Sequence, residues 1–420
     1  MTSDSSSENV ADLSVQEVQQ RLSQTLNAIT DREWIPLQEA LGRVLAADVI
    51  SPIHVPPHDN SAMDGYAFDG AQLDRSGELA LEVVGSVHAG QPWRKPLSER
   101  QCVKIMTGAP MPVGLDTVVP LEMCTRDENL VRFASSALRP GANRRRAGED
   151  LMQGQPALWA GQRLNPAALG LLASLGLQTV NVCRRLRVAC FSTGNEILSL
   201  GEAPREGAVY DSNRYTLSSL LNRLGVEVLD LGVVPDQPAA LLAAFERGTR
   251  EADAIVTSGG VSMGDADHTR AIMQRLGKVD FWRIAMRPGR PMAFGLLRSG
   301  SHHPVALFGL PGNPVAARVA FLVFVRPAVL RLMGAGPAEP ILLRAQITEA
   351  VRKRPGRTEF PRAIVSHNAQ GQLCVRTTGP QGSGLLSSMV QGNGLIVLPH
   401  DEGDIQPGAF VNVMMFDGVT

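Results

Sequence analysis

The 420-residue sequence has almost no net charge, few cysteines and no long run of apolar residues. A formal net charge of −1 gives no global field that would attract nucleic acid or an anionic membrane. The 5 cysteines are scattered without a CxxC spacing, which is typical of free thiols in a reducing cytoplasm. The longest apolar candidate, residues 315–332, contains arginines that a membrane span would avoid. The first residues lack the basic and apolar regions of a signal peptide. We therefore expect a soluble, cytoplasmic, multidomain protein without nucleic-acid or membrane partners.

Several common catalytic motifs are also missing. The sequence contains no Walker A motif, no GxGxxG fingerprint and no HExxH pair. These absences argue against a classical nucleotide triphosphatase, a dinucleotide-dependent dehydrogenase and a zinc hydrolase.

Changes in sequence texture predict the domain organisation. Residues 1–12 are polar, as in a disordered tail. Ser14 and Glu17 form a capping box ahead of apolar residues at helical spacing, and a second helix is expected over 37–46. Short β-like runs between Gly/Pro turns then follow from about residue 79 to 133. We predict a helical domain formed by residues 13–50 and 143–180, an inserted β-rich domain over 51–142, an α/β domain over 181–333 and a C-terminal β domain over 334–420.

The α/β region has the clearest pattern. Buried-type strands such as LRVACF alternate with helical segments, which predicts a mostly parallel sheet covered on both faces, an αβα sandwich. Ligands bind such sheets at the carboxyl ends of the strands. The turns STGNE, PDQP, TSGGVSMGDAD and GLPGNP follow predicted strands, so we expect them to line one rim.

The stretch from Ile255 to His268 is the strongest candidate site within that rim. A strand enters a Ser/Gly turn and then meets two aspartates before a helix, a geometry that can present N–H groups to a phosphate and carboxylates to a divalent cation. A Gly-Gly turn also occurs as a plain tight connection, and Asp267 could equally cap the helix. Acidic turn residues elsewhere have the same two interpretations; they are Asp59, Asp150, Glu196 and Asp236.

Three arginines surround one Pro-Gly turn in FWRIAMRPGRP. Arg283, Arg287 and Arg290 suit a tetrahedral oxyanion, because each guanidinium can bond two oxygens at once. Solvated surface arginines remain the alternative.

Eight motifs follow one another along the chain. They are PPHDNSAMDGYAF, IMTGAPMP, RRRAGED, FSTGNE, YDSNR, SGGVSMGDADHT, MRPGRPMAFG and GLPGNP. In sequence and in order they resemble those of the molybdopterin molybdenumtransferase family, the molybdenum insertases related to the C-terminal domain of gephyrin, and the resemblance extends from about residue 13 to the C-terminus.

This resemblance implies a homodimer of four-domain chains with an active site in a cleft between subunits. It implies insertion of molybdate into adenylylated molybdopterin, with Mg²⁺ or another divalent cation and release of AMP. Protein partners would be the upstream adenylyltransferase and acceptor molybdoenzymes. Catalytic positions carried over by motif are Asp59, Thr107, Asp150, Glu196, Asp236 and Asp267, and we assign Glu196, Asp236 and Asp267 to the metal. Substrate-binding positions are Ser258, Gly259, Gly260, Ser262, Gly264, Arg283, Arg287, Arg290, Pro311, Gly312, Asn313, Arg362 and Ser383.

The sequence differs from the family's usual residues at three positions, and two alternative functions compete with the insertase. The family often has lysine where this chain has Arg283, Arg287 and Arg290, so positive charge is kept but ammonium geometry is not. An adenylyltransferase-like or nicotinamide-nucleotide-processing relative would share the TSGG turn, but is not expected to carry DNSAMDGYA or the C-terminal β domain. A binding scaffold without catalysis would predict a degraded acidic rim, whereas the carboxylates are present. The sequence does not show whether the protein prefers molybdate or tungstate as its substrate.

Overall fold

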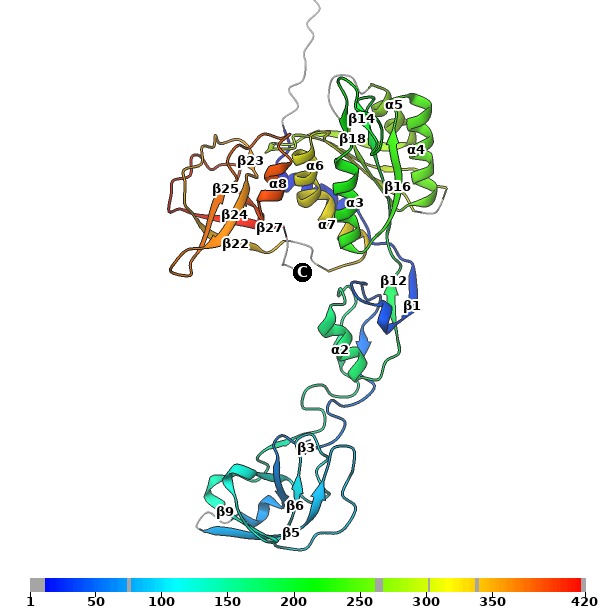
Figure 1. The fold of residues 1–420 in the computed structure, drawn as a ribbon. Helices are drawn as coiled ribbons and strands as arrows, with labels where there is room; N and C mark the ends of the chain where they lie inside the picture. Colours follow the sequence, from blue (N-terminus) through cyan, green and yellow to red (C-terminus); the bar gives the residue numbers. More distant parts are fainter. Residues whose placement is uncertain (1–11, 74–76, 261–266, 301–302, 337–339, 417–420) are drawn as a thin grey trace, which may run out of the picture. The chain divides into compact units, whose positions relative to one another are not determined.

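The computed structural model describes residues 12–73, 77–260, 267–300, 303–336 and 340–416, and for Asp267 the backbone alone. By its contacts the chain forms two compact units (Figure 1). The large unit comprises Met1–Glu33, Gly42–Ala46 and Val182–Thr420, and the small unit Trp34–Leu41 and Ala47–Asn181. The short strand β1 (Arg32–Pro36) pairs with β12 (Thr179–Cys183), and each of these two strands contains residues of both units. None of the described helices is long and apolar enough to span a membrane.

The small unit contains the predicted β-rich insertion. Its six-stranded sheet has the order β7-β4-β6-β5-β9-β8, and β4 is buried along its whole length. A Cβ on Gly65 would lie 2.0 Å from the Val119 carbonyl oxygen, so only glycine lets β4 and β7 approach this closely. The strands are β4 (Gly65–Phe68), β5 (Glu78–Val87), β6 (Gln101–Ile105), β7 (Thr117–Pro120), β8 (Thr125–Asp127) and β9 (Leu130–Ala134).

Smaller elements complete this unit. Asn165 caps α2 (Pro166–Ser174), whose first position is proline, as expected for a helix start. The predicted helix over 37–46 is wrong, because only a single 3-10 turn, η1 (Leu37–Glu39), forms there. The turn ends at Ala40; Gly42 then adopts φ +74°, and Leu45 forms an antiparallel bridge with Val182. Short pairs join β2 (Val49–Ile50) to β11 (Pro156–Leu158) and β3 (Asn60–Ser61) to β10 (Arg144–Arg145); 3-10 turns η2, η3 and η4 cover Gly70–Gln72, Leu121–Met123 and Ser135–Ala137.

The large unit is built on a six-stranded sheet with the order β16-β13-β17-β21-β20-β18. Neighbours from β16 to β21 run parallel, as predicted, whereas β20 runs antiparallel to both β21 and β18. The link 298–304 between β20 and β21 is too short for a crossover helix, so these strands pair antiparallel. The strands are β13 (Arg187–Thr193), β16 (Glu227–Val234), β17 (Ala254–Ser258), β18 (Gly277–Arg283), β20 (Pro291–Leu297) and β21 (Val305–Leu310).

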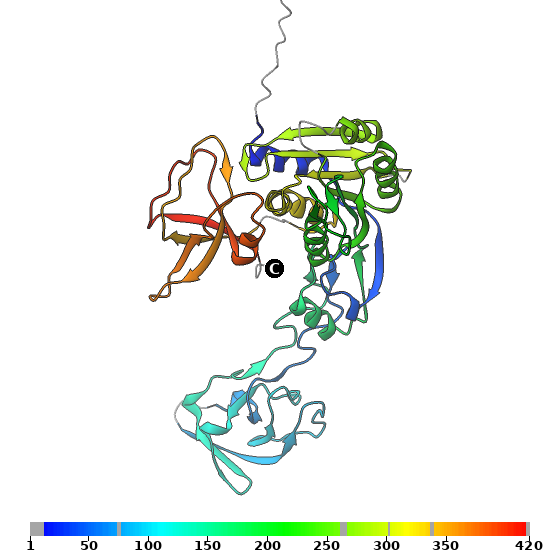
Figure 2. The ribbon, with the colours of Figure 1, turned by 45° about the horizontal axis from the view of Figure 1, so that its top comes forward.

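Helices cover both faces of this sheet, which confirms the αβα sandwich (Figure 2). One apolar cluster joins one face to α4 (Pro238–Glu251) and α5 (Asp267–Leu276). A second apolar cluster joins the opposite face to α1, α3 and the helical segment over 314–332, whose bounds are given below. The predicted capping box at the start of α1 is present. On this second face lie α1 (Val15–Thr25), α3 (Asn213–Leu224), α6 (Pro314–Ala320), the π-turn η5 (Phe321–Val325) and α7 (Arg326–Leu332).

The elements α6, η5 and α7 form one continuous helical segment with a π-turn in its middle. The π-turn ends at Val325, two residues before Pro327, which lacks an N–H and would clash with the preceding turn of a regular helix.

The C-terminal segment folds as the predicted β domain, a closed barrel with the order β22-β25-β24-β26-β27. Beside it, β23 (Thr358–Glu359) pairs with β19 (Met286–Arg287), which ties the barrel to the arginine segment of the α/β core. The barrel strands are β22 (Leu342–Ile347), β24 (Arg362–His367), β25 (Leu373–Thr377), β26 (Gly394–Val397) and β27 (Phe410–Met415); α8 (Ser387–Gln391) follows β25, and β14 (Ile197–Leu198) pairs with β15 (Val209–Tyr210) at the sheet rim.

Candidate active site

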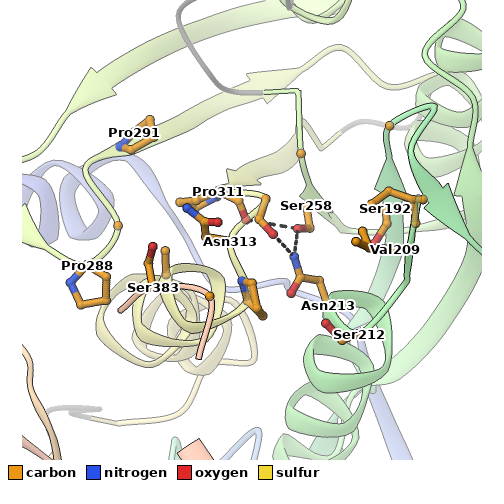
Figure 3. A pocket seen from close by; sticks show the side chains of 18 of the residues that line it. Ser192, Val209, Ser212, Asn213, Ser258, Pro288, Pro291, Pro311, Asn313 and Ser383 are labelled. Carbon is orange, nitrogen blue, oxygen red and sulfur yellow. Dashed lines mark hydrogen bonds between the residues drawn. The ribbon is translucent and has the colours of Figure 1, made fainter. Parts of the chain in front are cut away.

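A cavity of about 1270 Å³ opens at the carboxyl ends of the parallel strands (Figure 3). The turns after β13, β16, β17 and β21 all contribute to its wall, so the convergence predicted from topology is found. Residues 286–291, which include Arg287 and Arg290, and the turn at 381–384 contribute to the wall as well. Predicted site residues that line the cavity are Glu196, Asp236, Ser258, Gly259, Gly260, Arg287, Arg290, Pro311, Gly312, Asn313 and Ser383.

The acidic part of the wall is organised by the turn after β13. Gly194 has φ +148°, and a Cβ there would lie 2.6 Å from a carboxylate oxygen of Glu196, so the carboxylate folds back over the glycine. The Asn195 side-chain oxygen accepts a hydrogen bond of 3.2 Å from the Asp236 N–H. Asn195 therefore ties the turn that carries Glu196 to the turn that carries Asp236.

The turn after β17 is shaped by its glycines. Gly259 has φ +93°, and a Cβ there would meet the Thr193 carbonyl oxygen at 2.4 Å. The Gly259 N–H donates to the Leu310 carbonyl at the end of β21 at 3.1 Å, so this donor continues the pairing of β17 with β21 and is not available to an anion. Beyond Gly260 the turn leaves the described residues. Ser262, Gly264 and the side chain of Asp267 therefore lie outside them, although α5 begins at Asp267.

The three arginines do not act as one uncompensated cluster. The Asp12 carboxylate accepts from the Arg290 Nε at 2.9 Å and lies 3.1 Å from the Arg283 Nε. Arg283 does not line the cavity, whereas Arg290 and Arg287 do. Arg287 is 3.9 Å from the Glu359 carboxylate, which also pairs with Arg357. Asp12, the last residue of the predicted disordered tail, is therefore ion-paired, and residues 1–11 of that tail lie outside the described residues.

The barrel contributes Ser383 through a turn that Arg362 holds. Arg362 is only 1% exposed and donates to the backbone carbonyls of Gln381 at 3.1 Å and Gly382 at 2.9 Å, as well as to the Ser388 hydroxyl. Burial lowers the pKa of Arg362, and the neighbouring Arg287 charge lowers it further. Arg362 does not line the cavity, and its substrate-binding role stays a prediction.

The remaining predicted residues lie in the small unit. Asp59 accepts from the Ala147 N–H at 2.8 Å and pairs with Arg144 at 3.4 Å. The Thr107 N–H and hydroxyl both donate to the Asp64 carboxylate at 2.7 Å, and these bonds lower the pKa of Asp64. Asp150 donates its N–H to the Val55 carbonyl. Catalytic roles for Asp59, Thr107 and Asp150 stay predictions.

Sequence reasoning missed cavity-lining positions in YDSNR, although that motif contributed to the resemblance. Asp211 is buried and accepts from the Ser192 hydroxyl at 2.9 Å and from the Arg214 guanidinium at 3.1 Å. Asn213 donates to Ser258 and to the loop after β21. The available signal was a pair of small polar residues, Asp211 and Asn213, at the start of α3.

The acidic wall contains two of the three predicted metal ligands, Glu196 and Asp236. Within the described residues, no three His, Cys, Asp or Glu side chains gather as a metal site, and neither Glu196 nor Asp236 is in an ion pair. Two free carboxylates on one wall are the hard oxygen donors that Mg²⁺ prefers. They therefore fit a divalent cation, with Asp267 as the predicted third ligand.

Known proteins resemble this chain along almost its whole length. Three family models match in succession, "MoeA N-terminal region (domain I and II)" at residues 13–176, "Probable molybdopterin binding domain" at 189–331 and "MoeA C-terminal region (domain IV)" at 344–416. Molybdopterin molybdenumtransferase of Haemophilus influenzae is 41% identical, covering 96% of this chain and 99% of its own length. The Bacillus subtilis protein of that name is 33% identical, covering 92% and 90%.

A solved structure agrees with this. The crystal structure of a molybdopterin biosynthesis moeA protein from Pyrococcus horikoshii has a TM-score of 0.81 and 27% identity, covering 96% of this chain and 100% of that chain. Together with the cavity at the strand ends, these matches show that the chain belongs to the molybdopterin molybdenumtransferase, or MoeA, family.

Proposed function

We propose that this protein inserts molybdate into adenylylated molybdopterin, releasing AMP and molybdenum cofactor. One observation carries the proposal: a single cavity has the carboxylates of Glu196 and Asp236, which form no ion pair with another described residue, in one part of its wall and the guanidiniums of Arg287 and Arg290 in another. Both substrates are anions that repel each other, so a site that joins them must supply positive charge on both sides. The family relatives support this reaction through the names they carry.

The carboxylates would serve the adenylate half. Glu196 and Asp236, with Asp267, would hold Mg²⁺ through oxygen ligands. When bound, Mg²⁺ supplies charge neutralisation for the phosphates as AMP leaves. Asn195 would keep the two described carboxylates on the same wall, because its side chain accepts from the Asp236 N–H.

The arginines and Ser383 would serve the molybdate half. Arg287 and Arg290 line the cavity with half-exposed guanidiniums, and the Ser383 turn lies against the start of α6 through the bond from the Val315 N–H to the Ser383 carbonyl. A planar guanidinium can donate two hydrogen bonds to a tetrahedral oxyanion, so arginine replaces lysine here without loss of anion binding. Tungstate has the same shape and charge and would compete at this position.

We further propose the assembly and setting that the family resemblance implies. The protein would be a cytoplasmic homodimer that receives its substrate from an adenylyltransferase and passes its product to molybdoenzymes. The five cysteines, all free among the described residues, support a reducing compartment. The mass of the purified protein in solution tests the dimer, and a monomer would contradict it.

The decisive experiment incubates the protein with adenylylated molybdopterin, Mg²⁺ and molybdate, and follows AMP release and reconstitution of an apo-molybdoenzyme. We expect both products and a requirement for molybdate. Asp236→Asn should slow AMP release, whereas Glu251→Gln, which removes an exposed carboxylate paired with Arg247 on α4, should not. Tight adenylate binding without either product would instead identify a binding scaffold and refute the insertase.

A further inference from the structure

Asn213 lies where three segments of the cavity wall meet. It is the first residue of α3, is 9% exposed, and lies beside the end of β17 and the loop after β21. Its side-chain amide nitrogen donates to the Ser258 hydroxyl oxygen at 2.7 Å and to the Gly312 carbonyl oxygen at 2.7 Å, as Figure 3 shows. The Ser258 hydroxyl in turn donates to the Pro311 carbonyl at 3.2 Å.

These bonds use every hydrogen that the two side chains have. The amide of Asn213 has two N–H groups, and each serves a different segment. The hydroxyl of Ser258 has one hydrogen, which is directed to the Pro311 carbonyl. Ser258 can therefore donate to an anion only by breaking a bond within the wall. Its predicted contribution to substrate binding is better explained through the network than through a direct bond.

The residue type at position 213 is chemically specific. Two donors on one neutral, short side chain are needed, because one neighbour is a carbonyl and the other a hydroxyl whose hydrogen is already committed. Aspartate has the same shape but places a negative oxygen against the Gly312 carbonyl. Alanine leaves that buried carbonyl and the Ser258 hydroxyl without their donor.

We propose that Asn213 is a positioning residue, which holds the Ser258 turn against the Pro311–Asn313 loop so that the cavity keeps its substrate-binding shape. The proposal rests on the function proposed above, since the cavity is taken to bind the adenylylated substrate. Asn213 acts through Ser258 and Gly312, both of which line the cavity. Losing the network should weaken substrate binding more than it slows the chemical step, because the carboxylates and arginines lie on other segments.

The test compares Asn213→Asp and Asn213→Ala with Asn222→Asp. Asn222 is exposed on the same helix, about 13 Å further along α3 at the helical rise, and gives the same change of charge outside the cavity. Hydrogen–deuterium exchange of the peptides that contain 258–260 and 309–314 reports the positioning directly and needs no substrate. We expect faster exchange there in both Asn213 variants and unchanged exchange in Asn222→Asp.

Kinetics supply the readout that a merely structural role would not move. We expect Asn213→Asp to raise the KM for adenylylated molybdopterin at least tenfold, with kcat changed less than threefold. The difference from wild type should narrow as the pH falls, since the introduced carboxyl regains one donor when protonated. Unchanged exchange in the two peptides would overturn the proposal, as would faster exchange with unaltered KM. If wild type releases no AMP, the insertase fails while the exchange measurement still decides whether Asn213 positions the loop.

Discussion

The replacement of Gly259 by alanine tests whether the close approach of two turns shapes the cavity. Gly259 has φ +93°, a backbone conformation that residues with a Cβ rarely adopt. The added Cβ would also lie 2.4 Å from the carbonyl oxygen of Thr193, an atom of the turn after β13. Because that oxygen belongs to the backbone, it cannot rotate away as a flexible side chain would.

The two costs can be separated with Gly201. This glycine has the same φ of +93°, but nothing lies within 4 Å of the position that its Cβ would occupy. Gly201→Ala should therefore cost only the backbone strain, about 1–3 kcal/mol. Gly259→Ala should cost this strain plus the overpacking against Thr193, which adds roughly another 1–3 kcal/mol. The difference in the free energy of unfolding between the two variants therefore measures the cost of the steric contact with Thr193.

The test measures the Tm and the AMP affinity of the Gly259→Ala and Gly201→Ala variants. A difference of that size lowers Tm by about 2–4 °C for each kcal/mol in a unit of this size, so Gly259→Ala should melt clearly below Gly201→Ala. Calorimetric titration with AMP should show at least a tenfold loss of affinity in Gly259→Ala and none in Gly201→Ala. Equal Tm values and equal AMP affinities in the two variants would refute the argument that the contact with Thr193 shapes the cavity.

Three further variants test other contacts. Asp12→Asn removes the carboxylate that pairs with Arg290, so calorimetry should show molybdate binding up to about fivefold more tightly, the range for exposed ion pairs, and weaker binding would contradict this. Arg362→Met leaves buried carbonyls without donors at about 1–3 kcal/mol each, so Tm should fall, whereas an unchanged Tm with lost molybdate binding would make Arg362 a direct ligand. Thr107→Val removes a bond that lowers the pKa of Asp64. A lowered pKa stabilises the fold above the carboxyl's unfolded value, so urea melts should show a stability deficit at pH 6 that disappears as the pH falls below about 4.

The sequence predicted much of the scaffold because the governing signals are local. The run LRVACF forms the buried strand β13, and the Ser14–Glu17 capping box begins α1. Topology then predicted that the turns after the parallel strands would line one cavity. The helix expected over 37–46 failed, since its apolar spacing suited a helix but Gly42 and the packing of Leu45 favoured an extended chain.

The contacts that define the site could not be predicted in the same way, because they join residues far apart in the chain. Asp12 and Arg290 are 278 positions apart, and Asn213 and Gly312 are 99 apart. A local pattern shows which residues carry charge or donors. It does not show which of those groups are already engaged by another segment, and this decides whether they can meet a substrate.

Several hydrogen-bond donors in the cavity wall already bind other protein atoms, and this changes which groups can attract an anion. The glycine turn after β17 predicted a backbone cradle for phosphate, yet the Gly259 N–H binds the Leu310 carbonyl at the end of β21 and the Ser258 hydroxyl binds the Pro311 carbonyl in the following loop. Arg362 likewise directs its donors to a turn. The side chains of Arg287 and Arg290 are 54% and 55% exposed and line the cavity, so they carry most of the positive charge that an oxyanion would meet among the described residues. Attraction to this cavity therefore depends on solvent-exposed guanidiniums partly compensated by Asp12 and Glu359, and the described part of the glycine turn serves mainly to fix the wall's shape.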